Sequence, residues 1–72
     1  MGVDQVLIRL RKAKNMTQQQ LATEIGMTTT SYQRYEQGVR TPTLDKLLLL
    51  ADYYDVSLDY LVGRSDDPRR LP

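Results

Sequence analysis

The 72-residue chain contains neither cysteine nor histidine. Disulfide bonds are therefore excluded, and because carboxylates do not cluster at ligand spacing either, we expect no metal site and no cofactor. An enzyme is also disfavoured, since catalysis would need carboxylate pairs, lysine or an activated hydroxyl in a pocket that so small a domain has little room to form. We accordingly expect no catalytic residues.

Long apolar segments are missing as well. The longest run, residues 47–51, lies between Lys46 and Asp52 and is much shorter than the roughly 20 residues that cross a bilayer. The N-terminus has no apolar stretch of signal-peptide length, and the absence of cysteine suits a reducing compartment. We therefore expect a cytoplasmic protein with no membrane association.

A large charge imbalance is absent too, because the net charge is only +1. The charges are unevenly placed, however: residues 1–40 carry six basic and three acidic side chains, whereas residues 41–72 carry four basic and six acidic ones. A basic half is expected of a protein that meets phosphate with one face, although ordinary solvated charge would give the same count.

Strand-like alternation of apolar and polar residues is not found, whereas helical spacing recurs along the chain. Val3, Leu7 and Leu10 form the apolar stripe of a first helix. A fourth helix is predicted by apolar residues at i, i+3, i+4 and i+7, namely Leu44, Leu47, Leu48 and Ala51, with Thr43 as its N-cap. A short fifth helix over residues 58–62 ends at Gly63.

Two helices separated by a tight turn are predicted between these elements. Thr17 and Gln20 have the spacing of a capping box that begins the second helix, and Gly26 ends it. Thr28 can cap a third helix that runs through Glu36. Ala22 is small enough to let the two helices cross closely, and their angle can be fixed by Ile25, Met27 and Tyr32. This arrangement is that of a helix-turn-helix motif.

The expected fold is thus an all-α, five-helix domain over residues 1–63, followed by residues 64–72 as a flexible C-terminal tail or the start of a linker. The residues expected in the core are Leu21, Ile25, Tyr32, Tyr35, Leu47, Leu48, Ala51 and Leu61. Ile8 and Leu49 lie off the expected core faces and are candidates either for an interface or for ordinary single exposed apolar residues.

The sequence resembles the Cro/repressor-like, or Xre-like, helix-turn-helix proteins of bacteria and phages over nearly all of residues 3–63. The matching segments are 7–12 (LIRLRK), 17–22 (TQQQLA), 26–28 (GMT), 35–38 (YEQG), 40–42 (RTP) and 56–61 (VSLDYL). Two positions depart from the pattern. Asn15 stands where glycine is common, and both tolerate the left-handed turn that ends the first helix; Tyr35 stands where tryptophan is frequent.

The resemblance implies a lambda repressor-like domain that reads the DNA major groove with its third helix. Carried onto this chain, the base-reading residues are Thr29, Thr30, Gln33 and Arg34. The residues expected at the phosphates are Arg11, Thr17, Gln18, Thr28 and Arg40. Glu36 is expected to be structural and to pair with a basic residue of the first helix, because its charge would repel phosphate.

The implied function is that of a sequence-specific DNA-binding transcriptional regulator that acts as a repressor. The partners expected are double-stranded DNA with a near-palindromic operator and a second copy of the chain, which would contact the first around residues 56–62 and place the recognition helices about 34 Å apart. An antitoxin or another protein-binding module on the same fold stays open as the alternative, since a fold does not fix a function.

Overall fold

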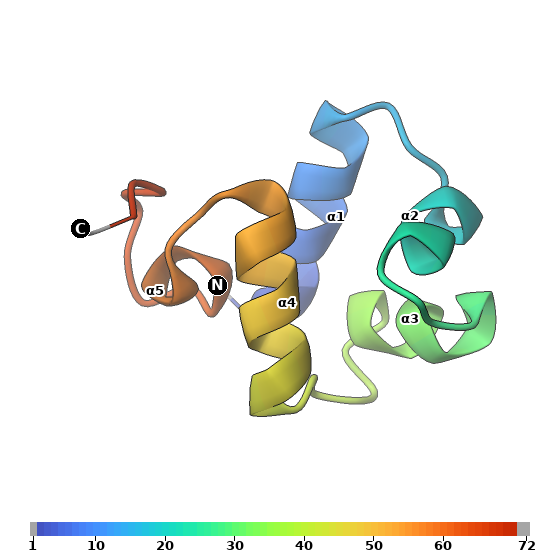
Figure 1. Ribbon diagram of the computed structural model, residues 1–72. Coiled ribbons are helices and arrows are strands. Elements are labelled where there is room, and N and C mark those ends of the chain that lie inside the picture. The colour runs from blue at the N-terminus through green and yellow to red at the C-terminus, as the bar shows by residue number, and fades with distance from the viewer. Residues whose placement is uncertain (1, 71–72) are drawn as a thin grey trace.

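A computed structural model describes residues 2–70 and contains five α-helices in this range (Figure 1). Their bounds are Val3–Ala13 (α1), Gln18–Glu24 (α2), Thr29–Glu36 (α3), Leu44–Tyr54 (α4) and Leu58–Leu61 (α5). In Figure 1, α2 and α3 lie on one side of α4, and α5 lies on the other. Helix α1 packs against both α3 and α5. The predicted all-α, five-helix architecture is confirmed.

Short polar side chains begin four of the helices. Thr17, Thr28, Thr43 and Ser57 each accept a hydrogen bond from the backbone N–H three residues further on. These hydroxyls satisfy amide groups that have no partner inside the helix. The predicted capping box is present, because the Gln20 side chain also accepts from the backbone N–H of Thr17 at 2.8 Å.

Residues with positive φ end the helices. Asn15 has φ 56° after α1, and Asp55 has φ 55° after α4. Both are residue types that tolerate the left-handed region. The prediction that Asn15 ends the first helix is confirmed. Helix α5 ends at Leu61, one residue before the predicted end.

The core lies where α1, α2, α3, α4 and α5 meet. Its buried residues are Val6, Leu7, Leu21, Ala22, Ile25, Tyr32, Tyr35, Leu50, Ala51 and Leu61. Leu48 was expected in the core, but it is 46% exposed, and Leu44 of the same predicted stripe is 61% exposed. Leu50, which the predicted stripe omits, is fully buried. In a run of four leucines, apolar spacing does not determine which side of the helix faces inward.

The segment after Gly63 contacts the junction of α4 and α5. The carbonyl of Pro68 accepts from the backbone N–H of Ser57 at 2.9 Å, and Arg70 forms an ion pair with Asp52 at 2.6 Å. The boundary at residue 63 and the flexibility of residues 64–72 stay predictions, and residues 71–72 lie outside the described range. Over residues 2–70, none of the helices is long and apolar enough to cross a membrane.

Candidate nucleic-acid interface

The outer side of α3 carries the four side chains expected to read bases. Thr30 and Arg34 are exposed, and Thr29 and Gln33 are half-buried. With 3.6 residues per turn, positions 29, 30, 33 and 34 fall within an arc of about 140°. The structure therefore places all four on one side of α3. Gln37, which follows the helix and falls in the same arc, is also exposed; the sequence-based prediction did not include it.

The turn between α2 and α3 is tight and closed by a backbone hydrogen bond. Gly26 has φ 72°, and the N–H of Met27 donates to the carbonyl of Ala22 at 2.8 Å. A Cβ added at Gly26 would meet no atom within 4 Å, so glycine is needed for the backbone conformation and not for space. Ala22 and Tyr32 are fully buried. The turn and these two buried side chains set the angle between α2 and α3.

An ion pair joins α1 to the end of α3. Nε of Arg11 donates to Oε2 of Glu36 at 2.7 Å, and a second guanidinium nitrogen donates to Oε1 at 3.0 Å. The side chains are 12% and 4% exposed. The third guanidinium nitrogen donates to the carbonyl of Met16 at 2.8 Å. The expectation that Glu36 pairs with a basic residue of the first helix is confirmed.

The ion pair keeps Glu36 ionised. Burial raises the pKa of the Glu36 carboxyl, but the hydrogen bonds that it accepts, above all from Arg11, bring the pKa below its ordinary value. Arg11 was expected at the DNA backbone, yet its side chain is mostly buried and all three of its nitrogens bond within the protein. The single acidic residue of α3 is thus withdrawn from the surface and neutralised.

Two glutamines extend this contact to the outer side of α3. Nε2 of Gln18 donates to Oε1 of Glu36 at 3.0 Å. Oε1 of Gln18 accepts from Nε2 of Gln33 at 3.1 Å. The structure thus brings Arg11, Gln18 and Gln33 into one network with Glu36. No pattern in the sequence predicts the contact between the two glutamines, which are 15 positions apart.

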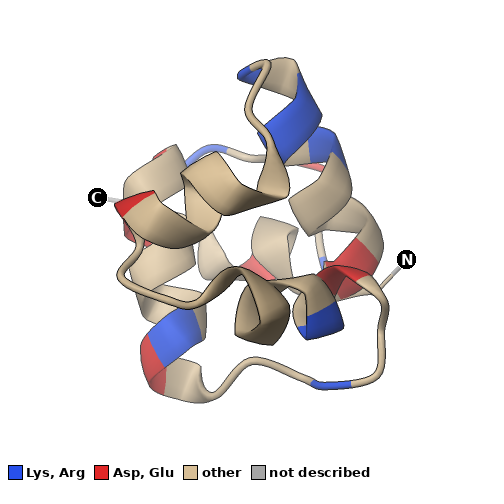
Figure 2. Cartoon of the chain, turned by 90° about the vertical axis from the view of Figure 1, so that its right-hand side faces the viewer, with Lys and Arg blue, Asp and Glu red and all other residues tan. Residues whose placement is uncertain are grey.

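The other expected phosphate contacts lie around this network. Thr17 and Thr28 begin α2 and α3, and their side chains cap these helices. Arg40 is exposed in the loop between α3 and α4, and its backbone N–H bonds to the carbonyl of Arg34 at 3.3 Å. Figure 2 views the side of α2 and α3, where basic segments border the face above and below.

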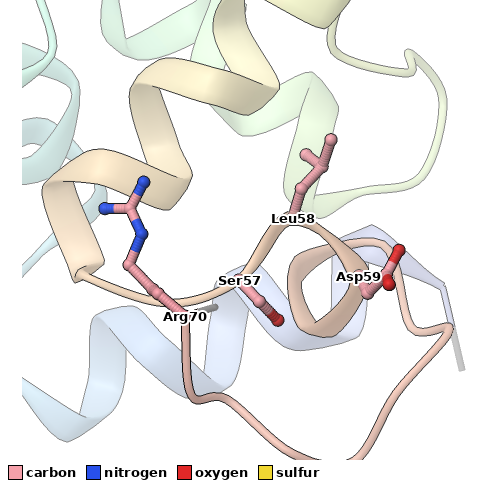
Figure 3. A pocket seen from close by; sticks show the side chains of 4 residues that line it. All are labelled: Ser57, Leu58, Asp59 and Arg70. Carbon is pink, nitrogen blue, oxygen red and sulfur yellow. The ribbon is translucent and has the colours of Figure 1, made fainter. Parts of the chain in front are cut away.

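The surface hollows lie elsewhere, at the junction of α4 and α5. One is lined by Ser57, Leu58, Asp59 and Arg70. Figure 3 shows that these four side chains point away from one another and do not converge on a common point. The described residues also contain no group of three or more side chains that could hold a metal ion. Between α1, α2 and α3, by contrast, the side chains of Arg11, Gln18 and Glu36 do converge.

Comparison with known proteins identifies the family. A family model described as helix-turn-helix matches residues 7–61. The chain is 52% identical over 64 residues to the uncharacterized HTH-type transcriptional regulator YobD of Bacillus subtilis, a match that covers 89% of the chain and 57% of YobD. It is 45% identical over 64 residues to the cryptic phage CTXphi transcriptional repressor RstR of Vibrio cholerae, with the same two coverages.

A solved structure shows the same fold. The crystal structure of a transcriptional regulator from Listeria innocua superposes with a TM-score of 0.79 and 33% identity, covering 85% of this chain and 57% of the other. The chain thus spans little more than half the length of the relatives that it matches. These relatives are named as transcriptional regulators, in agreement with the expectation that the chain is not an enzyme. Since the family model covers most of the chain and the resemblance seen in the motifs is confirmed, the chain belongs to the helix-turn-helix family.

Proposed function

We propose that this domain binds double-stranded DNA in a sequence-specific manner and regulates transcription as a repressor in the cytoplasm. The observation that carries the proposal is the outer side of α3. It offers hydroxyl, amide and guanidinium groups, whereas its one carboxylate is buried against Arg11. Such a surface can enter the major groove without repelling phosphate. The relative RstR is itself named as a transcriptional repressor.

The four residues in the arc of α3 are proposed to read base edges. Arg34 is the strongest candidate, because a guanidinium pairs bidentately with O6 and N7 of guanine. Thr29 and Thr30 can offer a hydroxyl to a base or a methyl group to the thymine methyl. Arg34 forms no ion pair within residues 2–70, so its guanidinium is available to a base.

Phosphate contacts are proposed for residues beside this arc. Arg40 supplies a positive charge from the loop after α3, and Thr17, Gln18 and Thr28 offer hydrogen bonds from the helix starts. For Arg11 we propose an indirect part, since its guanidinium is occupied by Glu36 and Met16. It would hold Gln18 in place without adding a free charge to the DNA surface.

We further propose that two copies bind a near-palindromic operator, with their recognition helices about one DNA turn apart. The exposed leucines of α4 favour a protein contact of some kind: Leu44, Leu48 and Leu49 are each at least 40% exposed. A protein-binding module, such as an antitoxin, remains the second candidate on this observation.

The test is a selection from a randomised duplex library at near-physiological salt. The expected result is a two-fold symmetric motif with half-sites one helical turn apart. Arg34→Ala should then lower affinity by about 1–3 kcal/mol and relax the preference at one base pair. Arg64→Ala is the matched control, because it removes the same charge from the exposed segment after α5. It should leave the motif unchanged.

Enrichment of no motif, with weak and strongly salt-dependent binding, would contradict the proposal and favour the protein-binding module. Equal effects of Arg34→Ala and Arg64→Ala would show that α3 does not read the sequence.

A further inference from the structure

The segment that follows α5 folds back along the junction of α4 and α5. At its far end, Arg70 forms an ion pair with Asp52 of α4 at 2.6 Å, and Figure 3 shows the Arg70 side chain reaching toward α4. In its middle, the carbonyl of Pro68 accepts from the backbone N–H of Ser57 at 2.9 Å. We call residues 64–70 the clasp, because they contact the chain on both sides of the corner between α4 and α5.

The clasp brings positive charge to an acidic corner. The sequence between Lys46 and Arg64 contains three exposed aspartates and no basic residue. Arg70 reaches two of these aspartates, Asp52 at 2.6 Å and Asp55 at 3.6 Å. The side chains of Arg70 and Asp52 are 41% and 67% exposed, so their ion pair is weak and is screened by salt. The clasp is therefore complementary to the corner in charge, but it is held weakly enough to be released.

Helix α5 depends on contacts of this kind because it is very short. It has four residues, about one turn, and so short a helix is not stable on its own in water. The side chain of Ser57 caps it by accepting from the backbone N–H of Tyr60, while the backbone N–H of Ser57 is bonded to the clasp. The Ser57 hydroxyl also donates to the carbonyl of Asp67 at 3.4 Å. Together with packing on α1 and α4, Ser57 thus connects the clasp to the order of α5.

We propose that the clasp is a releasable element that holds α5 in place and thereby controls the surface at residues 56–62, where a second copy of the chain is expected. The control of association rests on the proposed function, in which two copies bind one operator. A two-fold contact places the same patch of both copies face to face, and like charges repel there. The docked clasp orders α5 and neutralises Asp52 and Asp55, so it favours association. Its release loosens α5 and leaves two acidic corners that repel each other.

Amide hydrogen exchange tests the hold on α5 without DNA. Arg70→Gln removes the ion pairs, so the amides of Leu61 and Val62, which donate to carbonyls at the start of α5, should exchange about 1.5- to 5-fold faster. The amides of α2, on the other side of α4, are the internal reference and should not change (Figure 1). Arg64→Gln is the matched control, because Arg64 is an exposed arginine of the same segment and forms no ion pair within residues 2–70.

A second variant tests the clasp without changing its charge. Pro68→Gly keeps the carbonyl that accepts from Ser57, but it gives the released segment more conformations to lose on docking. The same α5 amides should therefore exchange about two- to fivefold faster. Adding Asp52→Asn to Arg70→Gln should change exchange little further, because both substitutions remove the same ion pair.

Association is measured by titrating the protein onto two duplexes, one with both selected half-sites and one with a single half-site. The unaltered protein should fill the two half-sites cooperatively. Arg70→Gln should lower this cooperativity by at least about twofold, because both copies lose the neutralising charge. Its affinity for the single half-site should stay unchanged, since Arg70 lies at the α4–α5 junction and not on α3. Arg64→Gln should leave the cooperativity unchanged.

Three results would overturn the inference. The α5 amides of Arg70→Gln could exchange no faster than those of Arg64→Gln, or the α2 amides could accelerate equally, which would indicate a loss of global stability. The third result is faster exchange in α5 with unchanged cooperativity. If the unaltered protein fills the half-sites independently or binds no duplex, the proposed function itself fails, whereas hydrogen exchange still measures the hold of the clasp on α5. The two failures are therefore distinguishable.

Discussion

Replacing Arg11 by methionine would leave the Glu36 carboxylate buried without its cation. Methionine fills much of the same volume, so the change removes charge and hydrogen bonds more than packing. Glu36 would lose two hydrogen bonds, at 2.7 and 3.0 Å, and would keep the one from Gln18 at 3.0 Å. Because its side chain is only 4% exposed, water cannot readily replace the guanidinium.

The expected loss follows from that burial. Breaking a buried ion pair by removing one partner costs about 3–5 kcal/mol. A domain of this length has a free energy of unfolding of roughly 4–11 kcal/mol, at about 0.05–0.15 kcal/mol per residue. Arg11→Met should therefore remove about a quarter or more of the free energy of unfolding. Lys12→Met is the matched control, because Lys12 is the exposed neighbour on α1, and it should change stability by less than about 0.5 kcal/mol.

Urea unfolding followed by far-ultraviolet circular dichroism measures these differences, provided that the unfolding free energy of every variant falls with urea concentration at the same rate. The double variant Arg11→Met/Glu36→Leu completes the experiment. It removes the stranded charge, and replacing a whole buried pair by apolar residues is often neutral or stabilising. The double variant should thus be more stable than Arg11→Met alone, by at least about 2 kcal/mol. If Arg11→Met costs no more than Lys12→Met, or if the double variant is less stable still, the reasoning from burial is refuted.

Three further predictions concern stability. Because the folded-state pKa of Glu36 lies below its ordinary value of 4.5, the ionised carboxylate stabilises the fold above pH 4.5, and this stabilisation is lost as the pH falls through the folded-state pKa. Glu36→Gln should therefore reduce the loss of stability in acid, measured as urea midpoints from pH 3 to 7. An unchanged dependence on pH would contradict the prediction. Tyr54→Phe removes a buried hydroxyl that has no hydrogen-bond partner, so the free energy of unfolding should stay equal or rise by about 1 kcal/mol. A fall of about 1 kcal/mol would instead show that the hydroxyl is hydrogen-bonded in the folded protein. Gly26→Ala places a residue with a Cβ at φ 72°, so the free energy of unfolding should fall by about 1–2 kcal/mol in urea unfolding. An unchanged free energy of unfolding would mean that the turn adopts another conformation without cost.

The helix boundaries could be predicted because they depend on residues close in sequence. Thr17 and Gln20 are three positions apart, and the backbone groups that they satisfy lie in the same turn. Asn15 adopts the left-handed conformation, which asparagine tolerates better than most residues. Each of these features depends on local chemistry, which the order of residues displays directly.

The inward face of α4 could not be predicted in the same way. Leu47, Leu48, Leu49 and Leu50 follow one another, so a helical stripe can be drawn through several phases of the same run. Packing against the other helices selects Leu50 and excludes Leu48, and this information lies outside the segment. The resemblance to the family located the outer side of α3, but neither it nor the spacing revealed the bond between Gln18 and Gln33. That bond requires the crossing angle of α2 and α3.

Helix α1 has a consequence for how such domains can be recombined. It packs against α3 on one side and α5 on the other, while α2 packs on α3 and α4 packs on α5. The α2–α3 pair is thus a unit that contacts the remaining helices chiefly through the packing of α3 on α1. To graft α2 and α3 of one relative onto the remainder of another, a designer would chiefly have to preserve the inner face of α1 and the charge pair between Arg11 and Glu36. The exposed positions of α3 could then be exchanged one by one. Gln33 would have to be exchanged together with Gln18, because their side chains are hydrogen-bonded to each other.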